Sequence, residues 1–187
     1  MCSSDLEAYD LVIVTPSVID ALVAKGKLAA GGRADIASVG IGVGIREGAP
    51  KPDISTVDGF FAALRGARAI AYSAGTSGLY IKDLIERRGL GAEMAPKTKV
   101  KSGGYAAEFI VSGEADIAIQ QMSEIIPVKG VMLVVPLPAP IQLITTYSGA
   151  LGAAPRDPAA TRALLAHLTG PNAPPLLAAR GLLVPGK

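Results

Sequence analysis

Residues 68–89 read RAIAYSAGTSGLYIKDLIERRG and contain a strand, a loop and a helix in that order. Residues 68–72 predict a short buried strand, and residues 73–78 a loop of small side chains. Between residues 79 and 88 the apolar side chains recur at helical spacing, and Gly89 follows where a glycine commonly ends a helix. This unit predicts an α/β fold.

The rest of the chain repeats the alternation of strands and helices. Further strands are predicted at residues 11–14, 37–45, 97–101, 115–119, 131–135 and 141–151. Further helices are predicted at residues 18–25, 57–64, 103–112, 158–168 and 173–180. Such an alternation implies a sheet rich in parallel strands, with binding sites at the carboxyl ends of those strands.

The composition excludes several classes of protein. Half of the 187 residues are hydrophobic, which supplies a sizeable core and argues against global disorder. Eighteen Lys and Arg residues against sixteen Asp and Glu leave a net charge of +2, too small for a typical nucleic-acid-binding surface. One Cys and one His exclude a disulfide and a His/Cys zinc site within the chain. We therefore expect no metal, no cofactor and no nucleic-acid partner.

The sequence shows neither an export signal nor a membrane-spanning segment. Residues 1–10, MCSSDLEAYD, contain three acids and no basic residue, whereas a secretory signal begins with a basic region. The longest apolar stretch, residues 131–147, contains Pro136, Pro138 and Pro140, a pattern that a spanning helix does not tolerate easily. We expect no direct membrane insertion.

Two glycine motifs raise a nucleotide-binding and a hydrolase interpretation, and each departs from the required pattern. In residues 40–44, GIGVG, Ile45 stands where a dinucleotide motif has its last glycine, so close strand packing is favoured. In the loop GTSG, Leu79 stands two residues after Ser77, where a hydrolase motif needs glycine. The only candidate base, His167, lies near a predicted helix end and is more typical of a surface group.

The loop at residues 73–78 also has the composition of an anion-binding cradle. The first N–H groups of a helix that begins near Ser77 have no helical acceptors, and the helix dipole favours negative charge there. Ser73, Thr76 and Ser77 add hydroxyl donors, while Gly75 and Gly78 let a ligand approach the backbone. A capped helix start with flexible glycines is an equal alternative.

Three lysines, Lys97, Lys99 and Lys101, alternate along one predicted strand and would share one face of it. Charged residues at a strand edge discourage edge-to-edge association. We therefore favour a solvated edge over a ligand-binding role for these lysines.

Five segments along almost the whole chain carry a family pattern. They are residues 9–28, 37–64, 67–90, 104–119 and 145–185. The SGEAD turn at residues 112–116 is the most specific of the matches. Together the segments resemble the periplasmic solute-binding proteins of ABC transporters, in particular the molybdate-binding type.

The resemblance implies a type 2 periplasmic-binding-protein fold, with two α/β lobes joined by two crossover strands and the ligand in the cleft between them. With the first boundary at the proline turn PKPD, residues 1–49 and 141–187 would form lobe I and residues 50–140 lobe II. The first strand–helix units of the family have no counterpart here. We therefore expect an N-terminally truncated pattern and an incomplete first lobe.

The resemblance also implies which residues bind the ligand. By position they are Ser73, Gly75, Thr76, Ser77, Gln121, Ser123 and Tyr147. Tyr147 matches a hinge tyrosine that reaches the ligand in the family. Two positions depart from the pattern, because Ser73-Ala74 replaces an Asp-Pro pair and Ser148 stands where a proline usually follows the tyrosine.

These implications favour the non-enzymatic, periplasmic binding component of an ABC uptake system, with a membrane permease as its partner. The ligand would be a small anion, either a molybdate-like oxyanion or a small carboxylate. The alternative is the ligand-sensing effector domain of a transcription regulator, because such domains share this fold. An enzyme on the same fold is disfavoured by the lack of a base–nucleophile pair.

Overall fold

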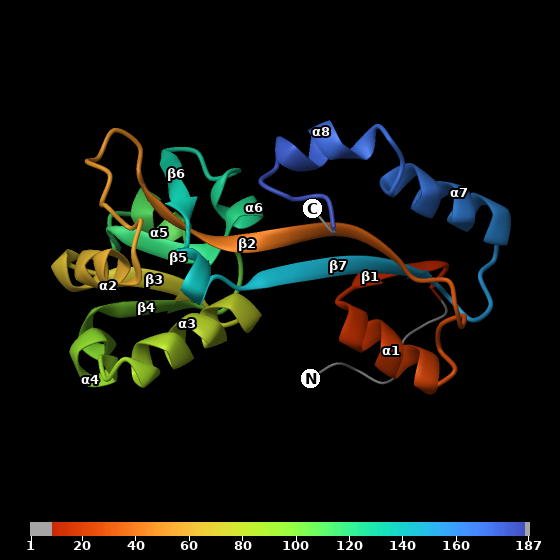
Figure 1. The fold of residues 1–187 in the computed structure, drawn as a ribbon, viewed down its shortest axis with the longest axis horizontal. Coiled ribbons are helices and arrows are strands. Elements are labelled where there is room, and N and C mark those ends of the chain that lie inside the picture. Colours follow the sequence, from red (N-terminus) through yellow and green to blue (C-terminus); the bar gives the residue numbers. More distant parts are fainter. Residues whose placement is uncertain (1–8, 186–187) are drawn as a thin grey trace. The chain divides into compact units, whose positions relative to one another are not determined.

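A computed structural model describes residues 9–185 and divides the chain into two compact units (Figure 1). Unit 1 holds residues 9–38 and 145–185 of the described chain, and unit 2 holds residues 39–144. The chain therefore passes from one unit to the other twice. Residues 1–8, which include most of the segment that we searched for an export signal, lie outside the described residues.

The strands of unit 2 form a mixed sheet. They are β2 (Ala34–Arg46), β3 (Ile70–Ser73), β4 (Thr98–Lys101), β5 (Ile117–Gln121) and β6 (Val131–Pro136), with the first residues of β2 counted in unit 1. The strand order is β2-β5-β3-β4, and β6 pairs with β2. The neighbours β5, β3 and β4 are parallel, as the alternation predicted, whereas β2 runs antiparallel to β5 and β6.

Helices cover both faces of this sheet. They are α2 (Val57–Gly66), α3 (Thr76–Arg87), α4 (Gly91–Met94), α5 (Glu108–Val111) and α6 (Met122–Ile125), with 3-10 turns at Ala95–Lys97 and Ala139–Ile141. Because side chains alternate along β3, Ile70 packs with α2 and α3 in the larger core, whereas Ala71 packs with Ile110 of α5 in a smaller, alanine-rich core. The small side chains of the second core let α5 lie close to the sheet.

The glycines of β2 are required by side chains that cross over the strand. A Cβ at Gly42 would lie 2.7 Å from Cδ1 of Leu133 and 2.9 Å from Cγ of Met122. A Cβ at Gly44 would lie 2.9 Å from Cγ2 of Ile125. The close-packing interpretation of the GIGVG motif is confirmed, because these glycines lie within a strand and do not open a helix.

Unit 1 is a smaller α/β layer. Its strands are β1 (Leu11–Val14), β7 (Ile144–Leu151) and the first residues of β2, in the order β1-β7-β2. Its helices are α1 (Pro16–Ala24), α7 (Pro158–Leu168) and α8 (Ala173–Ala178). Ile19 of α1 packs with Ala150 in one core, and Leu165 of α7 packs with Ile36 in another, so helices flank both faces of the strands.

Three sequence-based expectations differ from the structure. Residues 103–107 form a loop and not the first part of a helix, because Gly104 adopts a left-handed conformation with φ of +73°. The short helices α4 and α6 were not predicted, since four residues are too few to show a period. The units divide at 38/39 and 144/145, and not at 49/50 and 140/141, because β2 continues unbroken to Arg46 and pairs with β5 and β6.

No helix among residues 9–185 is long and apolar enough to cross a membrane. The prolines of the apolar stretch lie at the end of β6 and in the 3-10 turn that follows it. The longest apolar stretch, residues 131–147, therefore consists of β6, the 3-10 turn and the first residues of β7.

Replacing Gly42 by alanine should lower the free energy of unfolding by about 1–3 kcal/mol, the usual cost of overpacking a core. The added methyl group would overlap Leu133 and Met122. Gly66→Ala is the matched control, because a Cβ at the end of α2 meets nothing within 4 Å. Urea unfolding followed by circular dichroism measures both variants. Equal stabilities of the two variants would contradict the packing role of Gly42.

The SGEAD turn at residues 112–116 contains an interaction between Asp116 and Arg68 whose contribution to stability can be tested below neutral pH. Asp116 accepts hydrogen bonds from the backbone N–H of Arg68 at 2.7 Å and from its guanidinium at 3.1 Å. Burial raises the pKa of Asp116, but the hydrogen bonds from Arg68 outweigh it and hold the pKa below its usual range. A depressed folded-state pKa stabilises the fold above the unfolded value and loses that contribution as the pH falls.

Asp116→Asn should therefore be less stable than the wild type at about pH 6, and this difference should shrink toward about pH 3. Urea unfolding of both proteins across this range measures the effect. A stability difference that stays constant with pH would show that the carboxylate charge of Asp116 contributes nothing.

Candidate functional site

The candidate site lies at one edge of the unit 2 sheet, where the parallel strands end. Ser73, Lys101 and Gln121 are the last residues of β3, β4 and β5. Ser73 is the register partner of Lys101, and Tyr72 is the partner of Ile119, so the three ends are side by side. Loops that follow the carboxyl ends of neighbouring parallel strands are the usual place for a ligand in an α/β sheet.

The helix after β3 begins without a side-chain cap. Gly75 is the N-cap residue, and the first helical bond runs from the Leu79 N–H to the Gly75 carbonyl at 2.9 Å. The N–H groups of Thr76, Ser77 and Gly78 therefore have no acceptor within the helix. Ser77 lies inside α3 and does not cap it. An uncapped first turn leaves donors for an anion.

Gly78 sets the position of this helix on the strand. A Cβ at Gly78 would lie 1.6 Å from the carbonyl oxygen of Ser73 and 2.7 Å from its carbonyl carbon. The first turn of α3 therefore rests directly on the backbone at the end of β3. No side chain larger than a hydrogen atom fits at this position without moving the helix.

Three hydroxyls surround the helix start. Ser73 is half-buried, Thr76 is exposed and Ser77 is buried. Within the described residues, none of these hydroxyls is engaged in a hydrogen bond to another protein group. Gly75 is exposed, and a Cβ there would meet only the Ser73 hydroxyl, at 3.6 Å. The loop thus presents backbone and hydroxyl donors that the fold itself does not use.

Gln121 and Ser123 lie at the same edge. Gln121 ends β5, is buried and is the N-cap residue of α6, and Ser123 is half-buried within α6. Because β5 is the direct neighbour of β3, these residues follow the strand next to the Ser73 loop. Tyr147 is a half-buried residue of β7 in unit 1, and its part in ligand binding stays a prediction.

The charged groups near this edge are few. Burial raises the pKa of Glu124, against the opposing effect of hydrogen bonds from the Gln120 side chain and the Gln121 N–H. Lys101 Nζ lies 3.0 Å from Glu108 Oε2, and this hydrogen bond, together with the Tyr105 N–H, lowers the pKa of Glu108. Among residues 9–185 no three His, Cys, Asp or Glu side chains gather where they could hold a metal ion.

β4 is an edge strand of the sheet, as the lysine pattern predicted, but Lys97, just before it, and Lys101 are engaged with protein groups. Lys97 Nζ donates to the carbonyls of Arg65 at 2.7 Å and Ala67 at 3.1 Å, which satisfies the C-terminal end of α2. Lys101 is paired with Glu108, so of the three lysines only Lys99 is exposed. The partners of Lys97 were missed because they are 32 and 30 residues away along the chain, and that of Lys101 because no local pattern links it to Glu108.

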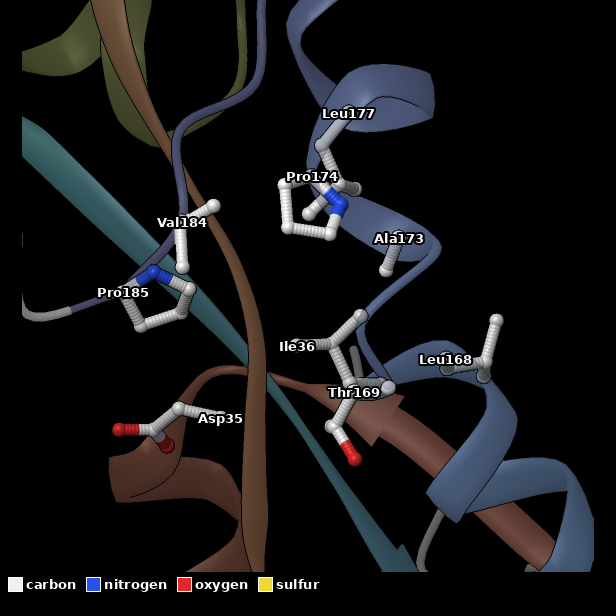
Figure 2. Close-up of a pocket in the computed structure, with 10 residues that line it drawn as sticks. Asp35, Ile36, Leu168, Thr169, Ala173, Pro174, Leu177, Val184 and Pro185 are labelled. Carbon is white, nitrogen blue, oxygen red and sulfur yellow. The ribbon is translucent and has the colours of Figure 1, made fainter.

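A separate cavity of about 310 Å³ lies within unit 1. Figure 2 shows Val184 and Pro185 on one side of it and Pro174 and Leu177 on the other. None of the predicted ligand-binding residues lines it, and no sequence motif predicts it.

The unit 1 cavity is unsuited to an anion. Asp35 lies at its wall and accepts a hydrogen bond of 2.6 Å from the wholly buried Ser148 hydroxyl. The cavity also borders the C-terminal end of α7 at Leu168 and Thr169, where the helix dipole is negative. Both features disfavour negative charge in this cavity.

The described chain thus consists of two α/β units connected by two chain crossings, and unit 2 presents a donor-rich strand edge. The chain belongs to the bacterial extracellular solute-binding protein family, whose model matches residues 4–183. The resemblance to solute-binding proteins and the type 2, two-lobed fold are confirmed.

Relatives include an aconitate isomerase from Pseudomonas sp, 36% identical over 177 residues, which cover 94% of this chain and 68% of that protein. The periplasmic molybdate-binding protein of Azotobacter vinelandii superposes with a TM-score of 0.73 at 20% identity, over 96% of this chain and 80% of that one. The tungstate-binding protein of Desulfovibrio alaskensis superposes with a TM-score of 0.59 at 14% identity, over 90% of this chain and 73% of that one. The two structures establish the fold.

Gly78→Ala should displace the first turn of α3 and lower the free energy of unfolding by at least about 2 kcal/mol, since a backbone clash cannot be relieved by a rotamer change. Gly75→Ala is the control, because it adds the same methyl group three residues earlier at a φ of −80°, with one ordinary contact. Thermal and urea unfolding compare the two variants. A Gly78→Ala protein as stable as Gly75→Ala would contradict the proposed seating of α3 on β3.

Proposed function

We propose that this chain binds a small carboxylate anion at the β3–β5 edge and delivers it to the membrane permease of an ABC uptake system. The observation that carries the proposal is the uncapped start of α3, where three N–H groups and the hydroxyls of Ser73, Thr76 and Ser77 make no hydrogen bond to another group within residues 9–185. Neutral donors and a helix dipole bind an anion without burying a counter-charge.

The choice of a carboxylate over a molybdate-like oxyanion rests on the relative of higher identity. That relative, at 36%, is named for aconitate, an unsaturated tricarboxylate, whereas the molybdate- and tungstate-binding structures are at most 20% identical. Carboxylate oxygens accept the same backbone and hydroxyl hydrogen bonds as other oxyanions, so the cradle suits either chemistry. The higher identity of the aconitate isomerase relative therefore favours a carboxylate ligand.

Transport is favoured over sensing by the family description. The matching family consists of extracellular solute-binding proteins, which supports a periplasmic location and a permease partner. A regulator's effector domain would share the fold, but the family match gives it no support of its own.

Isomerisation of a bound carboxylate is a second candidate function, and the name of the 36% identical relative is the observation that favours it. Such a reaction moves a proton from one carbon to another and needs a group that takes up and returns it. Glu124 is the nearest half-buried carboxyl in sequence to Ser123, and burial raises its pKa. Proton NMR of cis-aconitate with the protein separates the functions, because only isomerisation makes the trans-aconitate signals grow with time.

Isothermal titration with trans-aconitate, cis-aconitate and molybdate tests the proposed ligand class. We expect the aconitates to bind and molybdate to bind more weakly. Replacing Thr76 and Ser77 together by alanine removes two hydroxyl donors, each typically worth about 1.5–3 kcal/mol toward a charged group, so aconitate affinity should fall at least about tenfold. The helix itself should persist, since neither residue caps it.

Ser112→Ala is the control for this double variant, because it removes an exposed hydroxyl before the start of β5, at the other end of that strand. Its affinity for aconitate should equal that of the wild type. If the double variant binds as tightly as Ser112→Ala, the loop is only a helix start and the site lies elsewhere.

A further inference from the structure

Lys101 places a cation at the edge where the proposed ligand binds. It is the last residue of β4 and the register partner of Ser73 on β3. Its carbonyl accepts a hydrogen bond of 2.8 Å from the Ala74 N–H, which ties the cradle loop to β4. Neighbouring strands are about 4.8 Å apart, so the backbone of Lys101 lies about that distance from the backbone of Ser73.

The Lys101 ammonium is held in place and remains partly accessible. Its Nζ lies 3.0 Å from Glu108 Oε2 and 5.0 Å from the centre of the Phe109 ring. The Lys101 side chain is 27% exposed and that of Glu108 is 48% exposed. A partly buried, positioned cation loses less side-chain freedom on meeting an anion than a freely solvated one.

The other two lysines of this segment differ from Lys101. Lys97 is used by the carbonyls of Arg65 and Ala67, at the amino end of β4. Lys99 is exposed and lies two register positions before the Ser73–Lys101 pair, opposite Ala71. Lys101 differs from Lys97 and Lys99 in two ways. It lies at the edge where the ligand is proposed to bind, and its partner, the Glu108 carboxylate, can be replaced by a carboxylate of the ligand.

We propose that Lys101 is a specificity-determining residue that pairs with a second carboxylate of the ligand, while Glu108 holds the ammonium when no ligand is bound. The first carboxylate occupies the α3 cradle, and the second displaces Glu108 from Lys101. The site therefore selects di- and tricarboxylates over anions with a single compact charged group. This inference rests on the proposed function.

The test compares Lys101→Met and Lys99→Met by isothermal titration with trans-aconitate and with molybdate. Both variants remove one positive charge from the same strand, so Lys99→Met measures the long-range effect of net charge. Lys101→Met should weaken trans-aconitate about tenfold more than Lys99→Met does, the usual loss of one bond to a charged group. Molybdate has no second group to reach Lys101, so the two variants should bind it equally.

Glu108→Gln supplies an independent measurement if Lys101→Met proves unstable. Removing the competing carboxylate should tighten trans-aconitate about two- to fivefold, the worth of a typical exposed ion pair. Glu93→Gln, which breaks the 3.2 Å pair of Glu93 with Arg65, is its control and should leave the affinity unchanged.

Each outcome decides between the proposals. If the wild type binds trans-aconitate but Lys101→Met loses no more affinity than Lys99→Met, or Glu108→Gln binds no tighter, the role of Lys101 is wrong and the proposed function stands. If the wild type binds no aconitate, the proposed function is wrong and the inference about Lys101 falls with it.

Discussion

The seating of α3 on the end of β3 is the contact on which the candidate site depends. The backbone of Gly78 approaches that of Ser73 so closely that an added Cβ would overlap the Ser73 carbonyl oxygen. This contact fixes where the first turn of the helix lies relative to the three strand ends, and therefore where its unused N–H groups point. A donor set held by backbone packing needs no reorganisation when a ligand arrives, which lowers the cost of binding.

The groups around this helix start are either neutral donors or acids that already have hydrogen-bond partners. The cradle consists of neutral donors, and the nearby acids are engaged, because Glu108 is paired with Lys101 and Glu124 accepts a hydrogen bond from Gln120. An anion therefore meets favourable dipoles without a bare carboxylate at the same strand ends. Unit 1 presents the opposite polarity in its own cavity, where Asp35 and the end of α7 contribute negative charge.

The features that could be predicted from the sequence are those marked by a local pattern of residues. The strand–loop–helix unit around Ser73 could be located because small residues and hydroxyls interrupt an apolar strand just before a helical period, although its cap and its start were misplaced by a residue or more. Gln121 and Ser123 came from the family resemblance, since no local pattern marks them. The partners of Lys97, 32 and 30 residues away, and the pairing of Lys101 with Glu108 across the loop after β4 could not be predicted, because both depend on the tertiary fold and not on a local pattern.

The most direct test of the account is a two-dimensional ¹H–¹⁵N NMR titration of the isotope-labelled chain with trans-aconitate. Amide protons that bond to an anion shift strongly, so the account predicts that the signals of Thr76, Ser77 and Gly78 move most, with smaller shifts at the ends of β4 and β5. Shifts confined to Ile36, Thr169 and the other residues of the unit 1 cavity would contradict it and move the site to the other unit.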